Sequence, residues 1–165
     1  MDLQFQTCFW GADHGGFALK QDLRPRVQDW LETATPKSEF QHTDCGAFSD
    51  ESADYPDVAR LVVKGILNAD NSESPEAKTC GILMCGTGLG VSMAANRFPG
   101  IRAALCHTPD YARLAREHNN ANILVLGGRF IQAPAALAIV QTFITTPFQG
   151  GRHQRRIEKI ENVSF

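Results

Sequence analysis

Residues 79–90 of this 165-residue chain read TCGILMCGTGLG, an apolar run that ends at a cysteine and continues into a glycine-rich turn. An apolar run without alternation is typical of a parallel strand that is covered on both faces. The glycines at positions 86, 88 and 90 let the main chain approach a ligand closely, and a helix that begins behind them favours bound negative charge. This stretch therefore predicts a strand, a ligand-binding turn and a helix, the unit from which α/β folds are built.

Further expected strands and helices lie on either side of this unit. The expected strands are 5–11, 40–45, 79–85, 101–106 and 123–126. The expected helices are 16–31, 55–67, 90–97, 109–118, 133–143 and 151–162. Their alternation predicts a single domain over 1–165, a three-layer α/β/α sandwich with a five-stranded, parallel, Rossmann-like sheet. The polar segments 33–39 and 68–78 are expected to be surface loops without a role in chemistry.

Composition narrows the class of protein. A formal net charge of −2 argues against a nucleic-acid binder, and no segment has the length of a membrane span or the pattern of a secretory signal. Five cysteines without C-x-x-C spacing indicate free thiols in a reducing compartment, so we expect a cytoplasmic protein. The basic cluster at 151–159 in an otherwise near-neutral chain indicates a small anionic ligand.

The residues that follow the expected strands are rich in glycine, histidine, cysteine and acid. In open parallel sheets ligands bind beyond the carboxyl ends of the strands, so these residues are the first candidates for a site. The segments concerned are 13–16, 46–55, 85–90, 107–108 and 127–129.

Cys85 distinguishes this glycine-rich turn from the glycine-rich turns that bind nucleotides. A dinucleotide-binding turn requires an acidic residue at the end of the next strand, but that strand ends at Cys106 and His107; a nucleotide P-loop requires a Gly-Lys-Ser/Thr ending, which is absent. A thiolate is favoured at the start of a helix, where it can act as a base or nucleophile. Cys8, Cys80 and Cys106 are instead interpreted as small apolar residues of buried strands.

Two further pairs carry candidate side chains. Asp13 and His14 follow the first strand, where they offer an acceptor and a tunable donor to a polyhydroxylated ligand; Asp13 could instead simply cap a helix. His118 and Asn119 end a helix, where the helix dipole favours a protonated imidazole, although a plain C-terminal cap fits equally well.

The last helix carries two arginines four residues apart, Arg152 and Arg156, on one face. Guanidinium groups bind phosphate through two parallel hydrogen bonds, so the pair could clamp a phosphate, although a solvated basic face is the commoner role of such runs. Arg129, after the last strand, is a third phosphate candidate. No His/Cys/carboxylate cluster has the spacing of metal ligands, and we expect no metal and no cofactor.

Together these motifs resemble the type B ribose-5-phosphate isomerases, whose relatives include the galactose-6-phosphate isomerase subunits. The resemblance covers nearly the whole chain, through segments 11–17, 54–57, 85–97, 100–103, 117–119 and 150–156. It implies a five-stranded parallel sheet between helices. It also implies a homodimer or tetramer with the active site between subunits, so that helix 151–162 is expected to pack on a partner subunit.

The resemblance also implies a role for each candidate residue. Cys85 would be the base that moves a proton between C1 and C2, because Val91 and Ser92 stand where another branch of the family has a glutamate. Thr87 and the main-chain amides of the turn would hold the enediolate, and His118 would help to open the furanose ring. The remaining substrate-binding residues would be Asp13, His14, Tyr55, Gly86, Gly88, Leu89, Gly90 and Asn119. The phosphate-binding residues would be His14, Arg129, Arg152 and Arg156.

The expected activity is the interconversion of ribose 5-phosphate and ribulose 5-phosphate through a cis-enediolate. The same machinery could serve a tetrose 4-phosphate or a hexose 6-phosphate such as that of allose or galactose. A non-catalytic sugar-phosphate sensor would have no use for the cysteine, and an inactive partner subunit would lose part of the site. Every candidate position is occupied, which counts against both of these alternatives.

Overall fold

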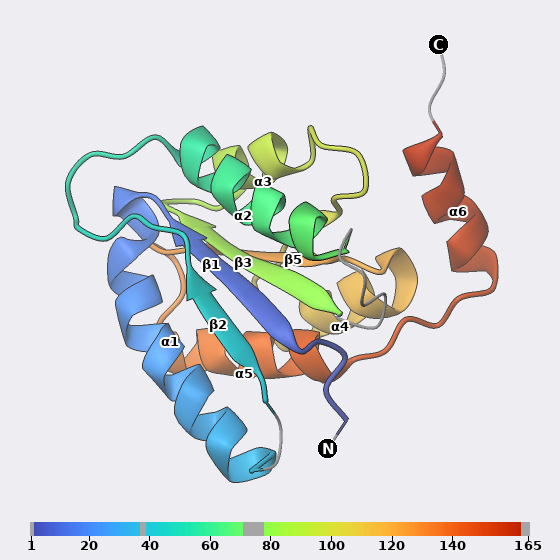
Figure 1. The fold of residues 1–165 in the computed structure, drawn as a ribbon, viewed down its shortest axis with the longest axis horizontal. Coiled ribbons are helices and arrows are strands. Elements are labelled where there is room, and N and C mark those ends of the chain that lie inside the picture. Colours follow the sequence, from blue (N-terminus) through green and yellow to red (C-terminus); the bar gives the residue numbers. More distant parts are fainter. Residues whose placement is uncertain (1, 37–38, 71–77, 163–165) are drawn as a thin grey trace.

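The computed structural model describes residues 2–36, 39–70 and 78–162, which form one α/β fold (Figure 1). Within these ranges the elements follow in the order β1 (Thr7–Ala12), α1 (His14–Ala34), β2 (Gln41–Asp44), α2 (Tyr55–Asp70), β3 (Thr79–Cys85), α3 (Leu89–Ala95), β4 (Ala103–Leu105), α4 (Pro109–Asn119), β5 (Ile123–Gly127), α5 (Ala133–Thr145) and α6 (Arg152–Glu161).

The five strands form one parallel sheet in the order β2-β1-β3-β5-β4, which confirms the predicted architecture. Every residue of β3 and β5 is buried, whereas the edge strand β2 alternates between exposed and half-buried residues. The order of the strands reverses between β1 and β3, and in open sheets ligands bind at such a switch point. Because Ala12 pairs with Met84, the carboxyl ends of β1 and β3 lie side by side there.

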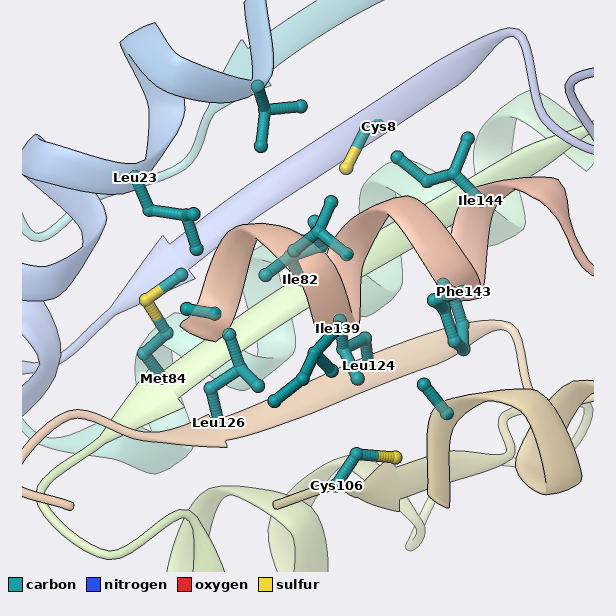
Figure 2. Packing of buried hydrophobic residues seen from close by; sticks show 14 of the residues in the cluster. Cys8, Leu23, Ile82, Met84, Cys106, Leu124, Leu126, Ile139, Phe143 and Ile144 are labelled. Carbon is teal, nitrogen blue, oxygen red and sulfur yellow. The ribbon is translucent and has the colours of Figure 1, made fainter. Parts of the chain in front are cut away.

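Helices cover both faces of the sheet. Helices α1 and α5 lie on one face, and α2 and α3 lie on the other (Figure 1). Neighbouring residues of β3 point to opposite faces: Met84 packs with Leu23 and Leu126 on the α1/α5 side (Figure 2), while Leu83 and Cys85 belong to the core on the α2/α3 side. Cys85 is therefore fixed by the same packing that fixes the fold.

Helix α1 begins at His14, two residues earlier than predicted, because the side chain of Asp13 caps it. One carboxylate oxygen of Asp13 accepts hydrogen bonds from the N–H groups of Gly15 at 2.8 Å and Gly16 at 3.1 Å. The alternative interpretation of Asp13 as a helix cap is thus confirmed.

The two predicted surface loops are partly helical. Helix α1 continues to Ala34, inside the predicted loop 33–39, and α2 continues to Asp70, inside the predicted loop 68–78. Residues 37–38 and 71–77 of these loops lie outside the described residues. Strand β4 is shorter than the predicted 101–106, and most other boundaries move by one to three residues, as expected where helix and strand ends fray.

The turn after β2 is fixed by a buried ion pair. Lys20, only 1% exposed, donates to a carboxylate oxygen of Asp44 at 2.6 Å and to the carbonyl of Ala47 at 2.7 Å. The N–H of Ala12 donates to the carbonyl of Gly46 at 2.7 Å. The carboxyl end of β2 is therefore held beside that of β1.

Helix α6 lies apart from the three layers and reaches the body of the molecule along one edge (Figure 1). Its buried residues, His153 and Ile157, are four apart and therefore share one face. At its far end Glu161 forms an ion pair with Arg102 at 2.6 Å and accepts the N–H of Gly100 at 2.9 Å. The remaining faces of this helix are exposed.

A buried tryptophan holds His42 of β2 in its neutral form. The indole N–H of Trp10 donates to Nδ1 of His42 at 2.9 Å, and burial together with the nearby charge of Arg24 lowers the pKa of His42 from 6.5 to about 4. In the neutral ring Nδ1 is thus the acceptor, and protonation of that nitrogen would break the contact.

This contact predicts a pH-dependent stability. The folded-state pKa is depressed, so the contribution of His42 is complete above pH 6.5 and is lost as the pH falls towards 4. Because solvent reaches part of the ring, the loss should be about 1–2 kcal/mol. Urea unfolding at pH 7.5 and 4.5 should show this loss in the wild type and a smaller one in His42→Gln, which keeps an acceptor. Equal losses in the two proteins would contradict the assignment.

Candidate active site

Cys85 is the last residue of β3 and only 4% exposed, and its own turn folds back over it. The main-chain N–H of Gly88 donates to the sulfur at 3.1 Å. Gly88 has φ of +81°, a left-handed conformation that favours glycine, and α3 starts at the next residue, Leu89. A main-chain donor on the sulfur is an arrangement that stabilises a thiolate.

Two other turns close around this one. The N–H of Gly128 donates to the carbonyl of Cys85 at 2.8 Å, and the N–H of Arg129 donates to the carbonyl of Gly86 at 3.0 Å. A Cβ placed on Gly15 would lie 2.8 Å from the main-chain nitrogen of Gly86, so no side chain fits between these turns. The carboxyl ends of β1, β3 and β5 therefore meet as glycine-rich main chain at the thiol.

The side chain of Arg129 lies against the same turn. A Cβ placed on Gly86 would be 3.1 Å from Nε and 3.2 Å from Cζ of Arg129. The guanidinium group therefore lies close to the start of the turn that carries Cys85. A positive charge in that place can bind an anionic group or stabilise negative charge that develops on a bound ligand.

Asp13 and His14 lie at the neighbouring end of β1. Asp13 is buried, and its N–H donates to the carbonyl of Met84 at 3.2 Å, one residue before Cys85. His14 is exposed, with Nδ1 within hydrogen-bond distance of the main chain of Ala53, 3.3 Å from its oxygen and 3.4 Å from its nitrogen. His14 thereby joins the start of α1 to the segment that leads into α2.

Tyr55 and Thr87 complete this group. Tyr55 begins α2, and a Cβ placed on Gly90 would lie 2.7 Å from Cζ of the tyrosine, so the ring packs on the glycine turn. Thr87 is exposed, and its hydroxyl accepts the N–H of Leu89 at 3.2 Å. We call this group the thiol cluster; it consists of Asp13, His14, Tyr55, Cys85, Thr87 and Arg129.

A second group of candidates surrounds the start of α6. The rings of His118 and His153 are stacked, with centroids 4.3 Å apart and planes within 4° of parallel. Arg152 and Arg156 are exposed, and in the part of the chain that the structure describes neither pairs with a carboxylate. We call these four residues the histidine–arginine cluster.

The two clusters lie at opposite ends of the sheet. His118 and Asn119 end α4, just before β5 begins at Ile123, whereas Cys85 pairs with Gly127 at the other end of β5. The four residue steps between these ends span about 13 Å. In Figure 1 the start of α1 and the helix α6 accordingly lie at opposite sides of the molecule. One copy of the chain does not bring all the predicted site residues together.

The other cysteines differ from Cys85 in their surroundings. Cys8, Cys80 and Cys106 are fully buried in the core, as their sequence positions predict. Burial raises the pKa of the Cys8 thiol, and it raises that of Cys106 to about 12. Cys45 is half-buried, and burial and the charge of Asp44 raise its pKa. In the described residues none of these four thiols accepts a main-chain N–H as Cys85 does.

Sequence analysis did not assign a role to His153. It is buried on α6 and stacked on a candidate catalytic residue, and burial together with the charges of His118, Arg152 and Arg156 lowers its pKa. A signal was present, since His153 and Ile157 stand four apart in a helix whose other residues, apart from Ile160, are polar or charged. That spacing indicates the face on which the helix docks.

Neither a metal centre nor a membrane span is found in the described residues. Across 2–36, 39–70 and 78–162, no three His, Cys, Asp or Glu side chains are grouped so that they could hold a metal ion. No helix in these same ranges combines the length and the apolar character needed to cross a bilayer.

Known proteins share both the sequence and the fold. The family model described as Ribose/Galactose Isomerase matches residues 9–160. The ribose-5-phosphate isomerase B of Escherichia coli is 38% identical over 154 residues, 93% of each chain. A ribose 5-phosphate isomerase structure from Thermotoga maritima is 53% identical, with a TM-score of 0.80 over 95% of this chain and 98% of the other.

A further relative has been solved with a ligand. The structure of ribose-5-phosphate isomerase B from Mycoplasma genitalium contains bound ribulose-5-phosphate; it is 38% identical to this chain, with a TM-score of 0.81, and the match covers 97% of this chain and 96% of that one. With its parallel sheet, its thiol cluster and matches over nearly the full length, the chain belongs to the ribose/galactose isomerase family.

The packing of Tyr55 on the glycine turn can be tested without an activity assay. Gly90→Ala would force the tip of the exposed tyrosine ring to move, which should offset the gain of about 0.5–1 kcal/mol that alanine brings inside a helix. In a Tyr55→Ala background the same substitution should show that gain in full, because the obstructing ring is gone. Urea unfolding of the two single variants and the double variant measures this coupling. Additive costs would show that the ring does not lie on the turn.

Proposed function

We propose that the chain is an aldose–ketose isomerase that interconverts ribose 5-phosphate and ribulose 5-phosphate, with Cys85 as the base. The observation that supports this most directly is the sulfur of Cys85 beneath its own glycine-rich turn, where it accepts the N–H of Gly88, at the switch point of the sheet. The activity printed for the relatives, and the ribulose-5-phosphate bound to one of them, fit the same reaction.

In the proposed reaction the Cys85 thiolate removes the proton from C2 of the open-chain aldose. The C–H electron pair forms the C1–C2 double bond of a cis-enediolate, and the negative charge moves to the carbonyl oxygen. The proton of the C2 hydroxyl then passes to O1, and the negative charge moves to O2. As C2=O2 forms, the electron pair of the C1–C2 double bond takes up a proton from the Cys85 thiol at C1, which yields the ketose and restores the thiolate. A positioned base contributes about 10²–10⁴-fold to the rate.

The glycine turn is suited to hold the enediolate. The N–H of Gly88 donates to the sulfur, and the hydroxyl of Thr87 lies in the same turn. The main-chain N–H groups of residues 86–90 and the Thr87 hydroxyl would donate to the enediolate oxygens, and such donors contribute about 10²–10³-fold each. Gly86, Gly88, Leu89 and Gly90 thus act through their main chain. Asp13 and Asn119 would bind sugar hydroxyls, and Tyr55, packed on the turn, would line the sugar pocket.

The histidine–arginine cluster would complete the site from a second copy of the chain. Arg152 and Arg156, with His14 and Arg129, would bind the phosphate, and His118 would act in ring opening. Because the two clusters lie at opposite ends of one chain, a symmetric dimer would join the thiol cluster of each copy to the histidine–arginine cluster of the other. The exposed helix α6 would then pack on the partner subunit.

The alternatives for the substrate differ in the length of the sugar chain. A tetrose 4-phosphate, or a hexose 6-phosphate such as that of allose or galactose, would require the same thiol with a different distance to the phosphate clamp. The pentose is favoured because the relatives quoted above are ribose-5-phosphate isomerases and one holds ribulose-5-phosphate. The five free thiols also fit the expected location in the cytoplasm.

Removal of the base should abolish turnover without loss of the fold. Cys85→Ala should lower kcat for ribose 5-phosphate by about 10²–10⁴-fold, because no other group described at the turn can replace the thiolate. Phosphate affinity, measured by calorimetry, should stay close to that of the wild type. Cys8→Ala is a matched control in the core and should retain kcat. Near-normal turnover by Cys85→Ala would exclude the proposed base.

The phosphate clamp should act chiefly through substrate binding. Arg152→Ala and Arg156→Ala should each raise KM for ribose 5-phosphate by about tenfold or more, since each removes a charge-assisted contact to phosphate. Arg155→Ala, on the same exposed helix, serves as the control and should leave KM unchanged. If KM is the same in all three variants, α6 does not carry the clamp.

The shared site can be tested by mixing two inactive variants. Cys85→Ala damages one cluster and His118→Ala the other, so a mixed dimer should contain one intact site. After unfolding and refolding together at equal amounts, about a quarter of the sites, and so about a quarter of wild-type activity, should return. Activity no higher than that of the separate variants would place both residues in a site within one copy.

A further inference from the structure

We propose that His153 is a positioning residue for ring opening, and that its stack with His118 joins the ring-opening group to the phosphate clamp. The inference rests on the proposed isomerase function, because only a furanose substrate requires ring opening. It adds a residue to which neither the sequence motifs nor the comparisons give a role.

The first argument is the geometry of the stack. At 4.3 Å and 4° the two imidazole rings are in face-to-face contact, and His153 is only 7% exposed. Within the described residues neither ring nitrogen of His118 forms a hydrogen bond to the protein, although the second nitrogen of a catalytic histidine usually orients the ring in this way. The face of His153 is therefore what fixes the plane of His118, while the ring edge that carries the nitrogens stays available to a ligand.

The second argument is the position of His153 on α6. It directly follows Arg152 and precedes Arg156 by three residues, so the clamp and the stack occupy the same turn and a half of helix. The helix docks through few groups, namely His153, Ile157 and the Glu161–Arg102 ion pair. A phosphate held by the two arginines would therefore hold His153, and through it the ring of His118.

The charges around the stack also favour His153 as the supporting ring and His118 as the ring-opening group. Burial, and then the neighbouring charges of His118, Arg152 and Arg156, lower the pKa of His153. Two stacked imidazolium rings would repel each other, so the neutral member is the buried one. The buried ring is thus the one suited to a supporting role.

Ring opening can be separated from proton transfer at carbon. In furanose ribose 5-phosphate a base removes the O1 proton, C1=O1 forms, the C1–O4 bond breaks, and O4 takes up a proton. Ribulose 5-phosphate has its carbonyl at C2 and its phosphate on O5, so it cannot close a furanose ring and binds as the open chain. Exchange of its C1 proton with D2O therefore requires the Cys85 chemistry but no ring opening.

The test compares these two rates in three variants of the full chain. His153→Ala should lower kcat for ribose 5-phosphate by about tenfold or more, because His118 loses its supporting face, while C1 exchange in ribulose 5-phosphate stays within about threefold of the wild type. His153→Phe, which keeps a flat ring, should recover most of the loss. Ile157→Ala, the matched control on the same face of α6, should affect the two rates equally.

Each other outcome has a definite meaning. An equal fall of both rates in His153→Ala, no fall in either, or a selective fall in Ile157→Ala would overturn the positioning role of His153. A wild-type chain that neither converts ribose 5-phosphate nor exchanges the C1 proton of ribulose 5-phosphate would instead refute the proposed function.

Discussion

The parallel pairing of β3 with β1 on one side and β5 on the other is the constraint on which the rest of this structure depends. It brings three carboxyl ends to one point, where the register pairs Met84 with Ala12 and Cys85 with Gly127. The turns that follow can approach so closely only because they are glycine, and no Cβ fits at Gly15 or Gly128 without backbone collision. The thiol is thus held by the sheet itself and not by a flexible loop.

The same topology separates the thiol cluster from the histidine–arginine cluster within one copy of the chain. A helix that crosses back between parallel strands must end at the amino edge of the sheet, so His118 at the end of α4 cannot reach the carboxyl edge of its own copy. Every copy nevertheless carries both clusters, the thiol cluster at the central strands and the histidine–arginine cluster on α4 and α6. Two-fold symmetry would join the two clusters at two equivalent places, since an isologous contact uses the same pair of surfaces twice.

Much of the fold could be predicted from sequence because its signals are local. The unbroken apolar run 79–85 predicted β3 to the residue, and the interpretation of Asp13 as a cap was available from its position before a helix. The boundaries of α1 and α2 were misplaced because polar residues at helix ends resemble loop residues. The stack of His153 on His118 could not be predicted, because it joins α4 to a helix outside the sandwich and depends on tertiary packing alone.

The most direct measurement of the central claim is a crystal structure of the assembled protein with ribulose 5-phosphate bound. The account predicts the sulfur of Cys85 next to C1 and C2 of the sugar, the enediol oxygens on the main-chain N–H groups of residues 86–90, and the phosphate on Arg152 and Arg156 of the other copy. A structure in which C1 and C2 of the bound sugar lie beyond the reach of the sulfur of Cys85 would contradict it.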